Sequence, residues 1–191
     1  MQTQSPSHTV GFSHPKRNIG VFDIQGGMKV ADFGSGSGAY ALLVAERLGG
    51  SGHVYAIDVQ KDLLRRTAHE AEKRGFRNVE VIWADLEAPR ASKLADACID
   101  LVLISNLLFQ VPDKLPVLRE ARRIMKPRGQ VAVIDWSGSY QGIGPRKEDV
   151  VNKEGAIELA RAAGLGLVRE FSPGAHHYGL MFRPTAEKTF V

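Results

Sequence analysis

The fold is decided by the stretch Met28-Lys29-Val30-Ala31-Asp32-Phe33-Gly34-Ser35-Gly36-Ser37-Gly38, a short apolar run followed by three alternating glycines. The apolar run predicts a buried strand, and the glycines predict a tight turn. Helical periodicity follows from Ala39 to Leu48 and stops at Gly49-Gly50. This is the pattern of a βα unit, the building block of a parallel sheet.

The same alternation continues along the chain. Short apolar runs predict further strands at residues 53–57, 79–83, 99–104, 130–134, 165–171 and 177–182. Helical periods predict helices near residues 60–74, 113–126 and 152–163. The last two strands are separated only by residues 172–176, which is too short for a parallel crossover and predicts an antiparallel hairpin. We expect one α/β domain over residues 28–183, with an amino-terminal arm at 1–27 and a tail at 184–191.

Composition excludes several classes of protein. The chain has 191 residues, a formal charge of +4 and 43% hydrophobic residues, which is ordinary for a globular domain. The single cysteine, Cys98, excludes an internal disulfide framework and a thiolate-clustered metal site, and we expect no metal. No apolar run approaches the roughly 18 residues of a membrane span. We therefore expect a cytoplasmic monomer or homodimer without a membrane span, and no nucleic-acid partner.

Ligands of open α/β sheets bind beyond the carboxyl ends of the strands. Here those ends carry Asp32 to Gly38, Asp58, Asp85, Ser105-Asn106 and Asp135-Trp136. The glycines allow a ligand to approach the backbone, and the helix after them presents free N–H groups. Such a loop can hold a phosphate or a carboxylate.

Taken alone, the glycine loop leaves two cofactors open. Gly34, Gly36 and Ala39 fit the dinucleotide pattern G-x-G-x-x-G/A, and Asp58 lies 22 residues after Gly36, where a ribose-binding acid is expected. Asp32 stands two residues before the first glycine, where a negative charge repels a pyrophosphate but attracts an ammonium or sulfonium group. The sequence also lacks the Tyr-x-x-x-Lys of short-chain dehydrogenases. A cationic amino-acid cofactor is favoured, with an NAD(P)-dependent oxidoreductase as the alternative.

The residues from Val30 to Gly38 resemble the glycine-rich first motif of class I S-adenosylmethionine-dependent methyltransferases. The similarity extends over about residues 28–183. Residues 118–129 resemble the ubiquinone/menaquinone-biosynthesis-like branch, although Arg128 stands where that branch more often has glycine. The resemblance implies a doubly wound, Rossmann-like sheet of seven strands in the order 3-2-1-4-5-7-6, with strand 7 antiparallel.

The resemblance also implies a cofactor, S-adenosyl-L-methionine, and a role for particular residues. Asp58 would bind both ribose hydroxyls, and Asp85 would recognise the adenine amino group beside the apolar Leu86. The implied cofactor-binding residues are Asp32, Gly34, Ser35, Gly36, Gly38, Asp58, Val59, Asp85, Leu86 and Ser105.

The sequence does not identify the methyl acceptor, and we expect a small molecule. Phe12, Phe22, Tyr140 and residues 106–111, Asn106 in particular, are expected to line its pocket. Methyl transfer from a sulfonium needs chiefly positioning, so no catalytic residue is assigned. If the acceptor must lose a proton, the candidate bases are Asp135, Tyr140, His176, His177 and Tyr178.

Two other acceptor classes are weighed. Arsenite methyltransferases resemble this chain along the core but bind their metalloid through several thiolates, and Cys98 is alone. A protein or RNA acceptor stays open because Arg119, Arg122, Arg123 and Lys126 share one helix face, although a solvated face is the simpler interpretation. A nucleotide-binding module without catalysis is a further alternative.

Overall fold

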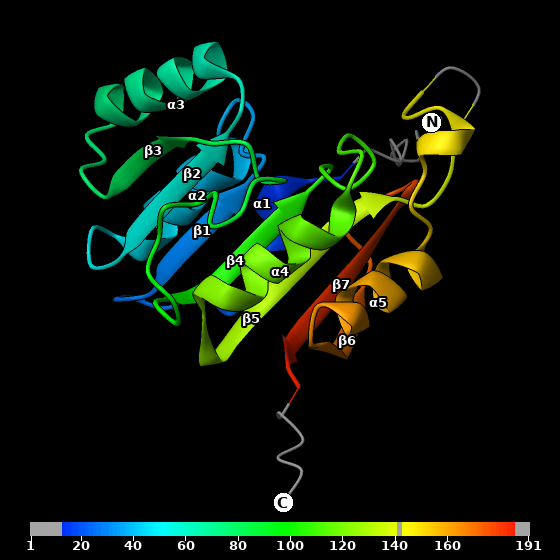
Figure 1. Ribbon diagram of the computed structural model, residues 1–191. Coiled ribbons are helices and arrows are strands. Elements are labelled where there is room, and N and C mark those ends of the chain that lie inside the picture. Colours follow the sequence, from blue (N-terminus) through cyan, green and yellow to red (C-terminus); the bar gives the residue numbers. More distant parts are fainter. Residues whose placement is uncertain (1–12, 141–142, 186–191) are drawn as a thin grey trace, which may run out of the picture.

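The computed structural model describes residues 13–140 and 143–185, which fold around one seven-stranded sheet (Figure 1). The strands lie in the order β3-β2-β1-β4-β5-β7-β6. β7 is antiparallel to both of its neighbours, β5 and β6. The pairs that join β3, β2, β1, β4 and β5 are parallel. The predicted strand order, the antiparallel seventh strand and the single α/β domain are confirmed.

The strands are β1 (Lys29–Phe33), β2 (His53–Asp58), β3 (Val79–Trp83), β4 (Ile99–Ser105), β5 (Met125–Trp136), β6 (Leu165–Phe171) and β7 (His177–Pro184). The helices are α1 (Pro15–Ile19), α2 (Ala39–Leu48), α3 (Lys61–Lys73), α4 (Lys114–Ile124) and α5 (Lys153–Ala162), with a 3-10 turn, η1, at Lys147–Asp149. Among the helices of the described ranges, none has the length and apolar character needed to span a membrane.

The beginning of β5 differs from the prediction. The helix was expected to reach Lys126, yet α4 ends at Ile124 and β5 begins at Met125 rather than Gln130. Pro127 explains the difference, because proline disfavours the helical conformation of the residue before it. Met125 instead pairs with Ile99, and the Lys126 ammonium lies 2.8 Å from a carboxylate oxygen of Asp100 on β4.

The two faces of the sheet carry different helices. α1 and α2 cover one face, and α4 and α5 cover the other (Figure 1). The first core includes Ile19, Phe22, Tyr40, Val44, Leu103 and Ile134. The second core includes Ile57, Ile104, Leu118, Ile124, Ala160 and Tyr178. The central strands β1 and β4 contribute to both cores, which explains their nearly continuous apolar sequences.

No helix joins β3 to β4 in this structure; residues 84–98 form turns. A buried carboxylate holds this segment in place. Glu120 on α4 accepts hydrogen bonds from the Ser92 N–H at 2.9 Å and the Ser92 hydroxyl at 2.6 Å. The Glu87 carboxylate accepts a bond from the Asp113 N–H at 2.8 Å. Both contacts fix the loop after β3 against α4, and with it the position of Asp85.

An amino-terminal strap, residues 13–24, crosses the face that carries α2. The His14 N–H donates to the Pro173 carbonyl, in the turn between β6 and β7. The Asn18 side chain, which is fully buried, donates at 2.9 Å to the hydroxyl of Tyr40, in the first turn of α2. The strap thus connects the turn between β6 and β7 with the start of α2.

Candidate functional site

The carboxyl ends of the parallel strands meet at one edge of the sheet. Phe33, the last residue of β1, pairs with Ile57 on β2 and with Ile104 on β4. The loop after β1 therefore lies between the ends of β2 and β4. This central place is where ligands bind in doubly wound sheets.

The glycine loop adopts a backbone that other residues rarely adopt. Gly34, Gly36 and Gly38 have φ angles of 69°, 53° and 78°. The Gly34 N–H donates to the Ile57 carbonyl at 2.8 Å, which anchors the loop to β2. A Cβ atom built on Gly36 would meet no atom within 4 Å, so this side of the loop is open to a ligand.

Asp58 connects the glycine loop with the start of α3. One carboxylate oxygen accepts the Gly36 N–H at 2.8 Å, and the other accepts the Gln60 N–H at 2.8 Å. Each carboxylate oxygen can accept a second hydrogen bond. The carboxylate can therefore hold the loop and still bind two hydroxyl groups of a ligand.

A cavity of about 400 Å³ opens beside these groups. Its volume is typical of cofactor sites. Six of the implied cofactor residues line it, namely Gly34, Gly36, Asp58, Val59, Asp85 and Leu86. The structure thus brings together the ends of β1, β2 and β3 as the sequence predicts.

Other lining residues were not assigned to the cofactor from the sequence. Gln60 and Leu63 come from the start of α3, one residue and one helical turn beyond Val59. A helix that starts directly after β2 places residues 60 and 63 close to Val59, so this spacing would have predicted both residues. Leu107 and Gln110 also line this cavity, although the sequence placed residues 106–111 at the acceptor.

Asp85 and Leu86 present a polar and an apolar group side by side. Asp85 is exposed, and one of its carboxylate oxygens accepts the Glu87 N–H at 3.0 Å. Leu86 is buried, with 6% of its surface exposed. This pair suits a flat, apolar ring with an amino group at its edge.

Asp32 lies behind the loop rather than on the wall of the cavity. Its carboxylate accepts the Ala41 N–H at 3.1 Å in the first turn of α2. Burial raises the pKa of Asp32 to about 7, and the nearby charge of Asp58 adds to this effect. Asp32 is therefore a buried group that exchanges its proton near neutral pH.

Two of the buried polar atoms that lack a hydrogen-bond partner within the described ranges follow the ends of β1 and β4. They are the Ser35 hydroxyl, in the glycine loop, and the Asn106 side-chain oxygen, beyond the end of β4. Buried polar groups without partners are rare in proteins and indicate an absent ligand or water. Both can accept bonds from an ammonium group, so the residues present fit S-adenosylmethionine.

The remaining implied cofactor residues have other contacts. Ser105 hydrogen-bonds the Tyr40 hydroxyl, and the pKa of Tyr40 is raised, chiefly by burial. Gly38 is the residue that precedes α2, and its N–H donates to the Ser35 carbonyl. Ser105 and Gly38 thus contribute to the site by positioning the start of α2.

The predicted acceptor pocket needs correction at Phe22. Phe22 is only 3% exposed and packs edge-on against Phe171, with ring centroids 5.9 Å apart. It belongs to the core beneath the strap, so the expectation that it lines an open pocket is wrong. Phe12 lies outside the described residues.

Tyr140 lies beyond the end of β5, beside the start of β7. Its hydroxyl is 2.8 Å from the Ser137 hydroxyl, and its ring stacks on His176 with centroids 4.0 Å apart. Trp136 stacks on His177 in the same way, at 4.3 Å. The end of the sheet beyond β4 is thus lined by aromatic rings.

Asp135 has a structural role at this edge. It is 1% exposed, and its carboxylate accepts the N–H groups of Leu108 at 2.9 Å and Trp136 at 2.8 Å. Burial raises its pKa to about 7. The carboxylate holds the turn after β4 against β5.

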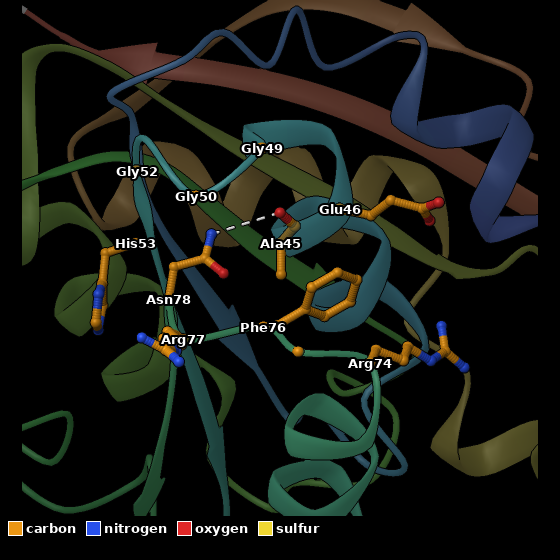
Figure 2. Close-up of a pocket in the computed structure, with 11 residues that line it drawn as sticks. Ala45, Glu46, Gly49, Gly50, Gly52, His53, Arg74, Phe76, Arg77 and Asn78 are labelled. Carbon is orange, nitrogen blue, oxygen red and sulfur yellow. Dashed lines mark hydrogen bonds between the residues drawn. The ribbon is translucent and has the colours of Figure 1, made fainter.

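A larger cavity of about 600 Å³ lies at the opposite edge, near the amino ends of β2 and β3 (Figure 2). Phe76 lies at its centre, with Arg74 and Glu46 to one side and His53 to the other. The Arg74 guanidinium lies 2.6 Å from the Glu70 carboxylate, and Glu46 adds a negative charge. Mixed charge and a place remote from the glycine loop distinguish this cavity from the predicted site.

Comparison with known proteins gives one family. The model of a family described as "Methyltransferase domain" matches residues 24–163. Among solved structures, a SAM-dependent methyltransferase from Aquifex aeolicus is similar over 93% of both chains, with a TM-score of 0.80 and 28% identity.

Two curated relatives show the range of acceptors among similar proteins. A demethylmenaquinone methyltransferase of Listeria welshimeri is 33% identical over 123 residues, which is 64% of this chain and 50% of the relative. An arsenite methyltransferase of Aquipseudomonas alcaligenes is 36% identical over 113 residues, or 57% of this chain and 33% of the relative. The chain thus spans half or less of these relatives.

We predict that Asp58→Ala weakens binding of S-adenosylmethionine by about 1–3 kcal/mol, or roughly 5- to 150-fold, because the ribose hydroxyls lose a charged acceptor. Calorimetric titration measures the change. Asp62→Ala is the control, since Asp62 is an exposed residue of α3. Equal affinities of the Asp58 variant and the wild type would contradict the assignment of Asp58.

We also predict that Asp32 makes the protein less stable as the pH rises. The native carboxyl keeps its proton up to about pH 7, whereas the unfolded carboxyl releases it near its ordinary pKa of 3.8. The contribution is therefore complete below pH 4 and lost above pH 7, with an upper limit of about 4 kcal/mol.

Urea unfolding at pH 5 and pH 7.5 tests this dependence on Asp32→Asn, which mimics the protonated carboxyl. The wild type should lose more stability between the two pH values than the variant. The similar contribution of Asp135 is present in both proteins and cancels. Equal losses would show that Asp32 is ionised in the native state at pH 5.

Proposed function

The chain belongs to the methyltransferase-domain family, and from that premise we propose that it transfers a methyl group from S-adenosylmethionine to a small-molecule acceptor. The cofactor is S-adenosylmethionine, in agreement with the sequence. Bound at this site, it supplies an activated methyl group on a sulfonium. The protein then needs to bind and orient the two reactants and to exclude water.

The observation that carries the proposal is the cavity at the ends of β1, β2 and β3. We assign Asp58 to the ribose hydroxyls and Asp85, beside Leu86, to the adenine. The open side of Gly36 receives the middle of the cofactor. The unpaired atoms of Ser35 and Asn106 receive its amino-acid end.

A small acceptor is supported by the demethylmenaquinone methyltransferase relatives. Arsenite is disfavoured because Cys98 is the chain's one cysteine and precedes β4, at the edge away from the glycine loop. A protein or RNA acceptor is also disfavoured. Arg123 on α4 is paired with Glu120 and Asp96. Lys126 does not share the predicted helix face, because it lies on β5, where it is paired with Asp100.

The domain boundaries, the cytoplasmic location and the monomeric or homodimeric state stay predictions. So does the absence of a nucleic-acid partner. An NAD(P)-dependent oxidoreductase is not favoured, because the chain matches a methyltransferase family and a solved methyltransferase structure.

A direct assay offers the purified chain S-adenosylmethionine and four sets of small acceptors: phenols and quinols, amines, thiols and carboxylic acids. We predict methylated product from at least one set, with one S-adenosylhomocysteine formed per product, as measured by mass spectrometry. Parallel reactions contain unfolded protein or RNA as the acceptor. Methyl transfer only to a macromolecule, or to nothing, would contradict the proposal.

A further inference from the structure

We propose that His177 takes the proton of the methyl acceptor through its Nε2 atom, an inference that rests on the proposed function. His177 is the first residue of β7, which is antiparallel, so it lies at the same edge of the sheet as the glycine loop. The sequence left five candidate bases at this edge. The geometry separates His177 from the other four.

The hydrogen bond of the ring decides which nitrogen is basic. Nδ1 of His177 lies 2.9 Å from the Ala175 carbonyl oxygen. A carbonyl oxygen only accepts hydrogen bonds, so Nδ1 carries the proton. In the neutral ring the lone pair is therefore on Nε2.

This lone pair has no donor within the described ranges. Nε2 is buried without a hydrogen-bond partner, and the residue is only 8% exposed. A buried acceptor of this kind indicates a ligand that brings a donor. The indole of Trp136 is partly exposed and packs against the ring in a tilted arrangement, with centroids 4.3 Å apart.

The register of the sheet places His177 on the same face as Ser105. Ser105 pairs with Ile134, and Trp136, two residues later, pairs with His177. Side chains at paired and at alternate positions share one face, so Ser105 and His177 point the same way. Two strand spacings and two residues separate their Cα atoms by about 12 Å. An acceptor that reaches His177 therefore comes from the face of the sheet on which Ser105 lies.

The charges around the ring keep it neutral. Burial lowers the pKa of His177, and the neighbouring His176 lowers it further. On β5 the carboxylate of Asp135 is on the opposite face, where it accepts the Leu108 N–H. From the strap, His14 approaches the same turn through its backbone. At neutral pH the ring is therefore unprotonated, and its Nε2 lone pair is available.

The other four candidates are less suitable. Both oxygens of Asp135 already accept backbone N–H groups. The Tyr178 hydroxyl donates to the Val151 carbonyl on the opposite face, and its pKa is raised by burial. Tyr140 and His176 stack on each other. These two rings would line the acceptor site, and neither is a buried base.

The step is balanced as follows. The acceptor atom forms the new bond to the methyl carbon, while the carbon–sulfur bond breaks and its electron pair goes to sulfur. The proton that the acceptor atom carried goes to Nε2 of His177. The positive charge of the sulfonium is thereby transferred to the imidazolium, and no further reactant is needed.

The first test needs no methyl transfer. Nitrogen NMR of the histidine-labelled full chain is recorded with phenol, a small hydroxyl donor, and with anisole, its methyl ether, which cannot donate. We expect an unprotonated Nε2 resonance of His177 that shifts with phenol and not with anisole. A protonated Nε2 at neutral pH, or equal responses to both compounds, would overturn the proposal.

The second test measures kinetics with an acceptor identified in the assay above, catechol being the first probe. We expect His177→Gln to lower kcat about 100-fold or more, with binding of S-adenosylmethionine unchanged. We expect kcat of the wild type to fall at acidic pH, and this fall should disappear in the variant. His69→Gln, at an exposed position of α3, is the control.

Failure of the His177 proposal can be distinguished from failure of the proposed function. Transfer by the wild type together with near-normal kcat in His177→Gln would overturn the role of His177 alone. No transfer by the wild type to any acceptor would overturn both proposals. If His177→Gln fails to fold, as judged by thermal melting, the NMR measurement on the wild type decides.

Discussion

The site depends on one carboxylate, that of Asp58, which joins the first two turns of the sheet. It accepts the Gly36 N–H after β1 and the Gln60 N–H before α3, each at 2.8 Å. The glycine loop keeps its left-handed backbone because this bond and the anchor to β2 hold it there. The same carboxylate faces the cavity. One side chain therefore both holds the glycine loop and lines the cavity.

Much of the fold was predictable from the sequence because local signals agreed with the final topology. Apolar runs predicted the strands, and the short connection at residues 172–176 predicted the antiparallel hairpin. The start of β5 was missed because the helical pattern continues to Lys126, while Pro127 imposes an extended backbone earlier. The neighbouring positions of Asp58 and Asp85 at one edge of the sheet were predictable because both residues end parallel strands, whereas the roles proposed for them come from the resemblance.

The acceptor side was harder to predict because it depends on tertiary contacts. Phe22 looked like a free aromatic residue in an irregular arm, yet it packs under the strap. Asp135 was one of five candidate bases, yet it holds the turn after β4. His176 lies in the turn before β7 whereas His177 begins the strand, and only the bond to Ala175 shows which nitrogen of His177 is basic. Such distinctions need side-chain geometry.

The central claim is that this edge of the sheet binds S-adenosylmethionine. Calorimetric titration of the purified chain with S-adenosylmethionine, and separately with oxidised and reduced nicotinamide dinucleotides, tests it most directly. The account predicts binding of S-adenosylmethionine in the micromolar range, about −8 kcal/mol, and no binding of either dinucleotide. Dinucleotide binding, or binding of none of the three, would contradict it.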